Sequence, residues 1–388
     1  MTAPDLAVVG SSLLENERRV PIHPSHFERI PESLRGRMLF EQGYGAPFGV
    51  SDARLGELFA GVRPRDQLLR GCRIALLPKM LTADLQEVSE GTVMWGWPHC
   101  VQNAEITQVA IDRRLTLIAW EEMHTWRRDG SQAMHLFYRN NEMAGYCGVL
   151  HAMALAGRDG GHYGPPPRAA VLSFGSVGRG AVYALQGLGV KDITVYTQRP
   201  AWSVHDRVPG CRYGQMIVAP DGDPTPIQVR DEEGRTRPLL EALTPCDVIV
   251  NGILQDTDRP LMFFTADEVD RFRENTLIVD VSCDRGMGFS FARPTSFEEP
   301  TFRVGPLTYY AVDHTPSYLW RSASHELSDV VIAFLEDVAR GPDGWASNES
   351  IRRAIEIRDG EIQNPRILSF QKRAPAWPHE RPSVSGTS

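Results

Sequence analysis

The sequence lacks the features that would mark a membrane or exported protein. No apolar run reaches the roughly 18 residues that spanning a bilayer needs, because the longest weakly polar stretch, residues 169–190, is interrupted by Arg179 and five glycines. The N-terminus has neither the basic start nor the long apolar core of a signal peptide. We therefore expect a soluble, cytoplasmic protein that has no membrane partner.

Cysteine pairs and basic stripes are also missing. The six cysteines are scattered and include no CxxC spacing, which favours reduced thiols over a disulfide framework or a zinc site, so no metal is expected. The net charge is −8 at pH 7 and no run of basic residues stands out. Phosphate backbones are usually bound by such runs, so nucleic acid is not an expected partner.

The length and composition of the chain are typical of a globular protein with two or three domains. The length is 388 residues, with 42% hydrophobic and 23% charged residues. In the first third, short apolar runs alternate with amphipathic segments, which indicates a parallel sheet covered by helices. Strands are expected at 6–9, 38–41, 73–77, 93–97 and 115–120, with helix N-caps at Ser25, Ser51 and Thr82.

A second α/β pattern follows a break rich in glycine and proline at 157–167. A long helix is expected before the break, at 140–156. After the break we expect strands at 169–174, 192–197, 247–251, 277–281 and 309–312, and helices at 181–188, 324–340 and 347–357. Residues 200–245 are polar and are interpreted as an excursion outside the core, and the proline-rich tail 364–388 is expected to lack its own fold.

The second pattern opens with a glycine-rich turn between a strand and a helix, in LSFGSVGRGA. In the dinucleotide-binding frame GxGxxG the three positions are Ser173, Gly175 and Gly178, so a serine must make the tight turn. The helix N-terminus would offer unpaired N–H groups to a pyrophosphate. The cofactor-binding residues predicted here are Ser173, Gly175, Ser176, Val177, Gly178, Arg179 and Gly180.

The end of the next strand indicates which nicotinamide cofactor is used. NAD sites usually carry an acidic residue there, whereas this chain has Thr197, Gln198 and Arg199. An arginine can pair with the 2′-phosphate that a carboxylate would repel, so the sequence favours NADPH/NADP over NAD. The competing interpretation is that Arg199 is an exposed surface charge.

Two proton-exchanging side chains stand close after strands of the first pattern. Lys79 follows the strand expected at 73–77, and His99 follows the one at 93–97. In an open α/β sheet, ligands gather beyond the carboxyl ends of the strands, so both side chains are candidates for acid/base work on a carbonyl. Each taken alone is more often structural than catalytic.

An ordered series of motifs resembles a known superfamily. ENERRVPIHP at 15–24, LLPKM at 76–80 and PHC at 98–100 resemble segments of the alanine dehydrogenases and the lysine-forming saccharopine dehydrogenases. IVDVSCD at 278–284 and AVDHTPSYLWRSAS at 311–324 extend the likeness. NEMAGYCGVLHA, LSFGSVGRGA and TQRP resemble the N5-(carboxyethyl)ornithine synthases of that superfamily. The resemblance covers about Leu6 to Arg340.

The resemblance implies a fold and a division of the chain. It implies an α/β protein of two Rossmann-like domains with parallel sheets and a cleft between them. A substrate (catalytic) domain is expected at 1–139 plus 316–388, and a dinucleotide-binding domain at 140–315. The partners expected are small molecules, a 2-oxo acid and a diamino acid, and a homo-oligomer is left open.

The resemblance also implies a reaction and residue roles. NADPH would drive the reductive condensation of a 2-oxo acid, pyruvate in the family, with the side-chain amine of ornithine or lysine. Lys79 and His99 would be catalytic and bind substrate together with Arg19, whose planar fork suits a carboxylate. Asp284 would lie beside substrate and nicotinamide, and Asp313 and His314 would contact the cofactor.

Three alternatives stay open from the sequence. One is reductive amination with free ammonia, as in alanine dehydrogenase. Asp313 and His314 disfavour this reaction, because alanine dehydrogenases normally have an asparagine-containing loop at that position. Another is a saccharopine-type dehydrogenase, which the residues 197–199 disfavour because that enzyme uses NAD. The third is a nucleotide-binding module without catalysis, although such a binder would not need Arg19, Lys79 and His99 together.

Overall fold

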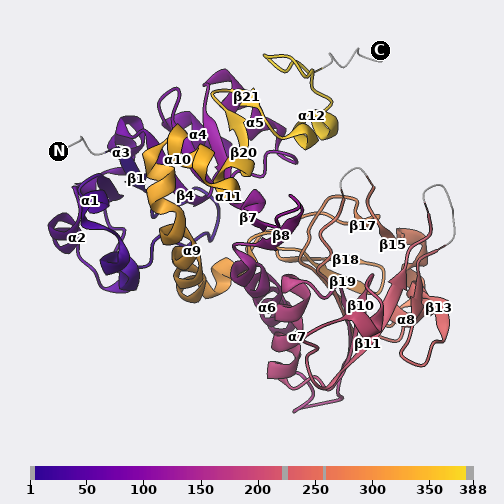
Figure 1. Cartoon of the computed structure of the whole chain (residues 1–388). Coiled ribbons are helices and arrows are strands. Elements are labelled where there is room, and N and C mark those ends of the chain that lie inside the picture. Colours follow the sequence, from indigo (N-terminus) through magenta and orange to yellow (C-terminus); the bar gives the residue numbers. More distant parts are fainter. Residues whose placement is uncertain (1–4, 221–225, 257–258, 382–388) are drawn as a thin grey trace, which may run out of the picture. The chain divides into compact units, whose positions relative to one another are not determined.

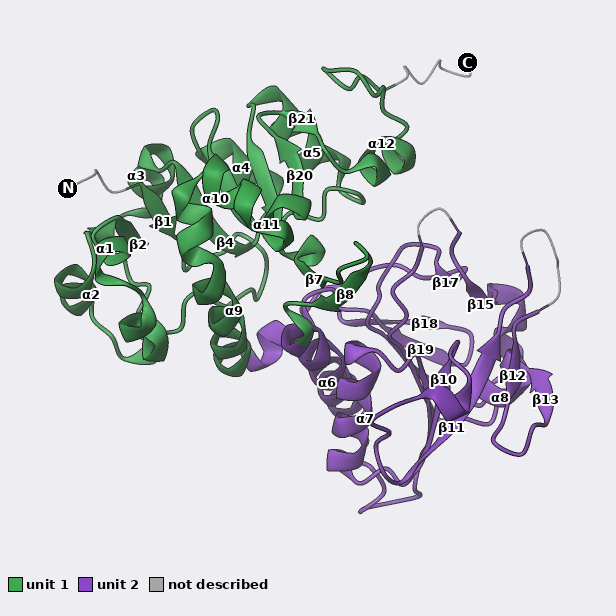
Figure 2. Ribbon diagram, in the orientation of Figure 1, with its two compact units in different colours: residues 1–138, 320–388 green, residues 139–319 purple. Residues whose placement is uncertain are grey.

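A computed structural model describes residues 5–220, 226–256 and 259–381. The chain divides into two compact units (Figures 1 and 2). Unit 1 consists of Met1–Tyr138 and Trp320–Ser388, and unit 2 consists of Arg139–Leu319. Unit 1 is therefore built from two separate stretches of chain, and unit 2 from one continuous stretch.

The sheet of unit 1 has eight strands in the order β21-β20-β6-β5-β4-β1-β2-β3. Its parallel strands have the 3-2-1-4-5-6 order of a doubly wound fold, whose switch point lies between β1 and β4. The antiparallel strands β20 and β21 extend the edge beyond β6. The strands are β1 (Leu6–Val8), β2 (Met38–Glu41), β3 (Gly61–Arg63), β4 (Ile74–Lys79), β5 (Val93–Trp97), β6 (Thr116–Ala119), β20 (Ile355–Arg358) and β21 (Glu361–Ile362).

Helices cover both faces of this sheet, because its central strands are apolar on both sides. In β1, Leu6 and Val8 pack into one core and Ala7 into the other. The first core is closed by η1 (Pro24–Arg29), α1 (Glu32–Arg35), α2 (Asp52–Leu58), α9 (Trp320–Arg340), α10 (Pro342–Ser347) and α11 (Glu349–Arg353). The second is closed by α3 (Arg65–Gly71), α4 (Thr82–Glu87), α5 (Ala104–Asp112) and α12 (Pro365–Gln371). The remaining elements are η2 (Ala46–Phe48), η3 (Trp120–Glu122) and the hairpin β7 (His124–Trp126) with β8 (Gln132–His135).

Unit 2 repeats the same winding in a nine-stranded sheet, in the order β13-β12-β11-β10-β9-β14-β16-β19-β18. Strands β11 to β19 of this order are parallel and again run 3-2-1-4-5-6. The strands are β9 (Arg168–Leu172), β10 (Asp192–Thr197), β11 (Cys211–Ile217), β12 (Gln228–Arg230), β13 (Thr236–Pro238), β14 (Val248–Asn251), β16 (Leu277–Asp280), β18 (Thr301–Val304) and β19 (Leu307–Tyr310). A separate pair is formed by β15 (Met262–Phe264) and β17 (Gly288–Phe289).

Two helices of unit 2 touch backbone to backbone on one face of the sheet. These are α6 (Tyr138–Leu155) and α7 (Ser176–Leu188). A Cβ atom on Gly180 would lie 1.7 Å from the carbonyl oxygen of Glu142, and one on Gly145 would lie 1.9 Å from that of Val177. Only glycine fits at either position. The other elements are η4 (Ala201–Ser203), α8 (Leu239–Leu243), η5 (Ala266–Arg271) and η6 (Thr315–Leu319).

Several sequence expectations are wrong in detail. The segment 200–245 is not an excursion outside the core, because it contains β11. This strand belongs to the parallel part of the unit 2 sheet, pairs with β10, and has Tyr213 and Met216 buried. The helix expected at 347–357 ends at Arg353 and gives way to β20, where alternating Ile355 and Ile357 pair with β6. The tail carries helix α12, with Ile367 buried in the core.

Of the three expected helix N-caps, one is confirmed and two are wrong. Ser51 caps α2 by accepting a hydrogen bond from the N–H of Arg54, as expected. Ser25 does not cap a helix, because His23 occupies that position before η1. Thr82 is the first residue of α4 rather than its cap. Among the residues that the structure describes, no helix has both the length and the apolar character required to cross a membrane.

Candidate active site

Lys79 and His99 lie at the carboxyl edge of the unit 1 sheet, as the sequence predicted for their position. Lys79 is the last residue of β4, where its backbone is in register with Trp97, and His99 stands just beyond the end of β5. The two strands are parallel neighbours, so both residues leave the sheet at the same edge. Lys79 is half-buried and the side chain of His99 is 42% exposed. Both are therefore placed where a small ligand could reach them.

A half-buried carboxylate that the sequence analysis missed holds His99 in place. Glu121, in η3 after β6, accepts a hydrogen bond of 2.6 Å from the backbone N–H of His99, and its Oε1 atom lies 3.6 Å from His99 Nδ1. His99 has φ +50°, a conformation that is uncommon for residues other than glycine. The bond to Glu121 fixes this turn and places a carboxylate behind the imidazole.

The side chain of Glu121 is 21% exposed, but its Oε2 atom is buried and a second carboxylate lies close by. Burial, followed by the charge of Glu356, raises the pKa of Glu121 well above its ordinary value. Burial likewise raises the pKa of Glu356, which comes from β20. Within the described part of the chain, the Oε2 atoms of both residues are buried without a hydrogen-bond partner. Two adjacent buried carboxylates favour keeping at least one proton between them.

Arg19 is buried and already engaged by a neighbouring carboxylate. Its Nε atom donates to Glu17 Oε1 at 2.8 Å, a second guanidinium nitrogen pairs with Glu17 Oε2, and the group lies 4.9 Å from the centre of the Trp97 ring. Both side chains are almost fully inaccessible to solvent. A substrate carboxylate could be clamped by Arg19 only if Glu17 shares or yields the guanidinium.

A pocket of about 280 Å³ opens beside this pair, within unit 1. It is formed where the chain leaves β1 and β2, at the carboxyl edge, by Ser11, Glu17, Arg18, Glu41 and Tyr44 among others. Arg18 is exposed and lies 5.1 Å from the centre of the Trp320 ring. The pocket therefore offers both acidic and basic groups, which suits a zwitterionic ligand better than an apolar one.

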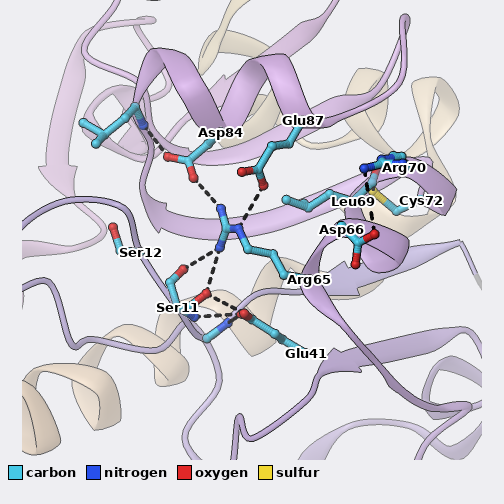
Figure 3. Close-up of polar contacts among 12 residues, drawn as sticks. Ser11, Ser12, Glu41, Arg65, Asp66, Leu69, Arg70, Cys72, Asp84 and Glu87 are labelled. Atoms are coloured by element: carbon cyan, nitrogen blue, oxygen red, sulfur yellow. Dashed lines mark hydrogen bonds and ion pairs between the residues drawn. The ribbon is translucent and has the colours of Figure 1, made fainter.

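An ion network fixes the loop that carries this pocket (Figure 3). Arg65 of α3 donates two hydrogen bonds of 2.9 Å to Ser11, pairs with Glu87 at 2.9 Å and forms a shorter pair with Asp84. Glu41, at the end of β2, accepts bonds from the backbone N–H of Ser11 and from its hydroxyl. The start of the loop 10–19 is thereby tied to three elements, β2, α3 and α4.

In unit 2 the glycine-rich turn has the conformation that its sequence predicted. Ser173 adopts φ +91°, and its backbone N–H donates to Tyr196 at 2.7 Å. The Ser173 hydroxyl accepts a bond of 3.2 Å from the N–H of Gly175. A Cβ atom on Gly178 would lie 2.2 Å from the Ser173 carbonyl oxygen, so this position must be glycine. A serine therefore makes the turn, and α7 begins directly after it at Ser176.

Two arginines at this turn contact Phe174, one through its backbone carbonyl and one through its ring. Arg199, which follows β10, donates a hydrogen bond of 2.8 Å to the Phe174 carbonyl. The guanidinium of Arg179, in the first turn of α7, lies 4.5 Å from the centre of the Phe174 ring. Thr197 is buried, whereas Gln198 and Arg199 are exposed. The amino end of α7 and two cations therefore lie together, an arrangement suited to phosphate groups.

A buried polar cluster that the sequence analysis missed lies at the ends of β14, β16 and β19. Asp280 accepts hydrogen bonds from the Tyr309 hydroxyl at 2.5 Å and from the Asn251 amide at 2.9 Å. Burial raises the pKa of Asp280 to about 6, although the hydrogen bonds from Tyr309 and Asn251 act to lower it. Burial and the charge of Asp280 raise the pKa of Asp284 to about 6 as well. The sequence signal for this cluster was limited to one aspartate, Asp280, at the end of the apolar run LIVD.

The remaining predicted residues lie at the same edge of the unit 2 sheet. Asp313 and His314 follow β19, and Asp313 Oδ1 lies 2.5 Å from His314 Nδ1. His314 is buried with its ring 5.0 Å from that of Phe297. The parallel strands β9, β10, β16 and β19 thus bring together all predicted cofactor residues and Asp284, at the edge where doubly wound sheets bind ligands.

Family models match both units. The model for the alanine dehydrogenase/PNT N-terminal domain matches residues 12–144, and that for the C-terminal domain matches residues 153–365. The chain therefore belongs to the alanine dehydrogenase/PNT family, and its chemistry is of the reductive dehydrogenase type found among its relatives. It is thus an oxidoreductase of this family.

Individual relatives have low sequence identity to this chain, but each match covers most of both chains. An N(5)-(carboxyethyl)ornithine synthase from Clostridium botulinum is 24% identical over 81% of this chain and 88% of its own. An alanine dehydrogenase from Mycolicibacterium smegmatis is 23% identical over 92% of this chain and 94% of its own. A solved L-alanine dehydrogenase shares the fold with a TM-score of 0.73 at 18% identity, covering 94% of this chain and 98% of its own.

Proposed function

We propose that this protein catalyses the NADPH-dependent reductive condensation of a 2-oxo acid, pyruvate first among them, with the side-chain amine of ornithine or lysine. The product would be an N-(1-carboxyethyl) amino acid. The observation that supports this most is that Lys79 and His99 follow neighbouring strands at the carboxyl edge of the unit 1 sheet, the edge at which the mixed-charge pocket beside Glu17 also opens. The names of two relatives, both N(5)-(carboxyethyl)ornithine synthases, support the same chemistry.

The proposed division of work follows from the ionisation that each step requires. The incoming amine must lose a proton before it attacks the carbonyl, and the oxygen must gain protons before it leaves as water. His99 would exchange these protons, and Lys79 would hold and polarise the oxo-acid oxygen. Arg19 would bind the acid's carboxylate, sharing its guanidinium with Glu17. Glu121 would keep the imidazole of His99 oriented through its bond to the backbone N–H.

The cofactor part of the proposal rests on unit 2. A nicotinamide cofactor would supply hydride to the imine carbon. The amino end of α7 and Arg179 would receive the pyrophosphate, with Ser173, Gly175, Ser176, Val177, Gly178 and Gly180 shaping the turn. Arg199 would pair with the 2′-phosphate, because its guanidinium is already held at the turn by the Phe174 carbonyl. Asp284, Asp313 and His314 would lie toward the nicotinamide end.

The test is a screen of NADPH oxidation with product identification. Pyruvate, glyoxylate and 2-oxoglutarate are each combined with ornithine, lysine or ammonia, and the products are identified by mass spectrometry. We expect turnover with pyruvate and a diamino acid, and a product with a new bond between the acid's carbon 2 and the side-chain nitrogen. Turnover with ammonia alone would instead support an alanine dehydrogenase reaction, as in the mycobacterial relative, and 2-oxoglutarate with lysine a saccharopine-type reaction. Oxidation with none of the nine pairs would contradict the proposal.

A further inference from the structure

Unit 1 contains a second cluster of ionisable side chains, between η1 and α9. His26 comes from η1, and His325 and Asp329 come from α9, about 300 residues later in the chain. His26 Nε2 lies 3.1 Å from His325 Nε2 and 3.7 Å from Asp329 Oδ1. One ligand atom from each of the three lies within 4.8 Å of the others.

We propose that His26, His325 and Asp329 bind a zinc-class divalent metal ion, which ties α9 to η1 within unit 1. Two imidazole nitrogens and one carboxylate oxygen are a ligand set that such ions prefer, with a water in the fourth position. Nitrogens that share a tetrahedral zinc at about 2.0–2.1 Å stand about 3.3 Å apart, close to the separation seen between His26 and His325.

Local structure supports metal binding in three ways. His325 and Asp329 are four residues apart on α9, so they project from the same face of that helix. The other ring nitrogen of His26 lies 2.9 Å from the hydroxyl of Ser328, the kind of outer contact that orients a metal-binding imidazole. His26 is also buried, so the surrounding side chains restrict the movement of its imidazole.

The cluster also contains a competing cation. Arg29 pairs with Asp329 Oδ1, so a metal ion would have to share this carboxylate or take its other oxygen. Without a metal, a hydrogen bond between the two imidazoles would account for their approach. The proposal also departs from the expectation that the protein has no metal, which rested on cysteine spacing and did not consider histidines distant in sequence.

The experiment measures metal binding directly and does not use the enzymatic assay. Full-length protein without an affinity tag is stripped with a chelator, and then titrated with CoCl₂ followed by visible absorption and with ZnCl₂ followed by mass spectrometry of the bound metal. We expect one equivalent of either ion, and a rise in apparent Tm with zinc. Ser328→Ala should weaken binding about 10- to 100-fold, the range for outer contacts.

Ligand variants decide the assignment. His325→Ala should lose the bound equivalent, while His205→Ala, which removes an exposed histidine in unit 2, should keep it. If His325→Ala lowers the Tm of the metal-free protein, Asp329→Asn removes a ligand with less change of shape and should lose the metal too. The absence of a stoichiometric metal in the wild-type protein, or its retention in both ligand variants, would overturn the site. Neither result bears on the proposed reaction.

Discussion

Replacing Arg65 with methionine should destabilise unit 1 far more than the loss of an ordinary surface arginine. The Asp84 side chain is fully buried, at 0% exposure, and the Arg65 side chain is only 16% exposed. Burial raises the pKa of Asp84, while the N–H of Leu81 and the charge of Arg65 act against that rise. Arg65→Met leaves the carboxylate without its cation and also removes both bonds to Ser11.

The size of the effect follows from these exposures. Removing one partner of a buried ion pair costs about 3–5 kcal/mol, and because Arg65 keeps some contact with water we expect the lower end, about 3 kcal/mol. The control is Arg54→Met, whose partner Glu57 is 64% exposed and whose loss should cost about 0–1 kcal/mol. Adding Asp84→Asn to Arg65→Met removes the stranded charge and should restore part of the loss.

The assay exploits the distribution of tryptophan. The chain has eight tryptophans, and all except Trp202 belong to unit 1. Urea unfolding followed by tryptophan fluorescence therefore reports mainly on unit 1. Equal losses of stability in Arg65→Met and Arg54→Met, with no recovery in the double variant, would refute the reasoning.

The pH dependence of the same variant has a defined sign. Without Arg65 the folded pKa of Asp84 rises further above its unfolded value. A raised folded pKa gives stability that is present below the unfolded pKa and is lost as the pH rises through the folded pKa. The destabilisation of Arg65→Met should accordingly be smaller at pH 5 than at pH 8.

Other predictions address the cofactor, the catalysts and the helix pair. Arg199→Ala should raise the KM for NADPH about 10- to 150-fold, matching about 1.5–3 kcal/mol for a charged hydrogen bond, and leave that for NADH nearly unchanged; equal effects in steady-state kinetics would remove the argument for NADPH. Lys79→Met and His99→Ala should each lower kcat about a hundredfold or more at saturating substrates, and wild-type turnover in His99→Ala would exclude its role. Arg19→Lys should raise mainly the KM for the oxo acid, because charge is kept and the fork is lost. Gly180→Val should prevent the contact of α6 with α7 and lower the apparent Tm, whereas Gly187→Ala on the same helix has open space around its Cβ atom and should not.

Most strands were predictable because each is a short apolar run between turn-forming residues. The strand expected at 192–197 has these bounds in the structure, and the one at 38–41 does as well. Strand β11 was missed because polar Arg212 and Gln215 interrupt its run, and it shows as a strand only when paired with β10. Strand β20 is another such case, because its place in the sheet depends on pairing with β6, which is far away in sequence.

The position of a candidate residue in the fold was predictable where the residue stands at the end of a strand. This holds for Lys79, His99 and Arg199, because the ends of the strands fix where they lie. Glu121 and Asp280 were missed because their importance comes from burial and partners, which no local pattern records. The pairing of Arg19 with Glu17 was missed as well, although the two are close in sequence, since it depends on how the loop is buried.

The interrupted construction of unit 1 has a consequence for how the chain folds as it leaves the ribosome. Strand β6 is complete early, yet its outer neighbour β20 begins at Ile355, after the whole of unit 2 has been made. Until then the buried strand TLIA, residues 116–119, has one edge without its native partner. Unpaired apolar edges are prone to aggregation. Unit 2 is one continuous stretch, so we expect the N-terminal part of unit 1, rather than unit 2, to be the aggregation-prone part of the nascent chain.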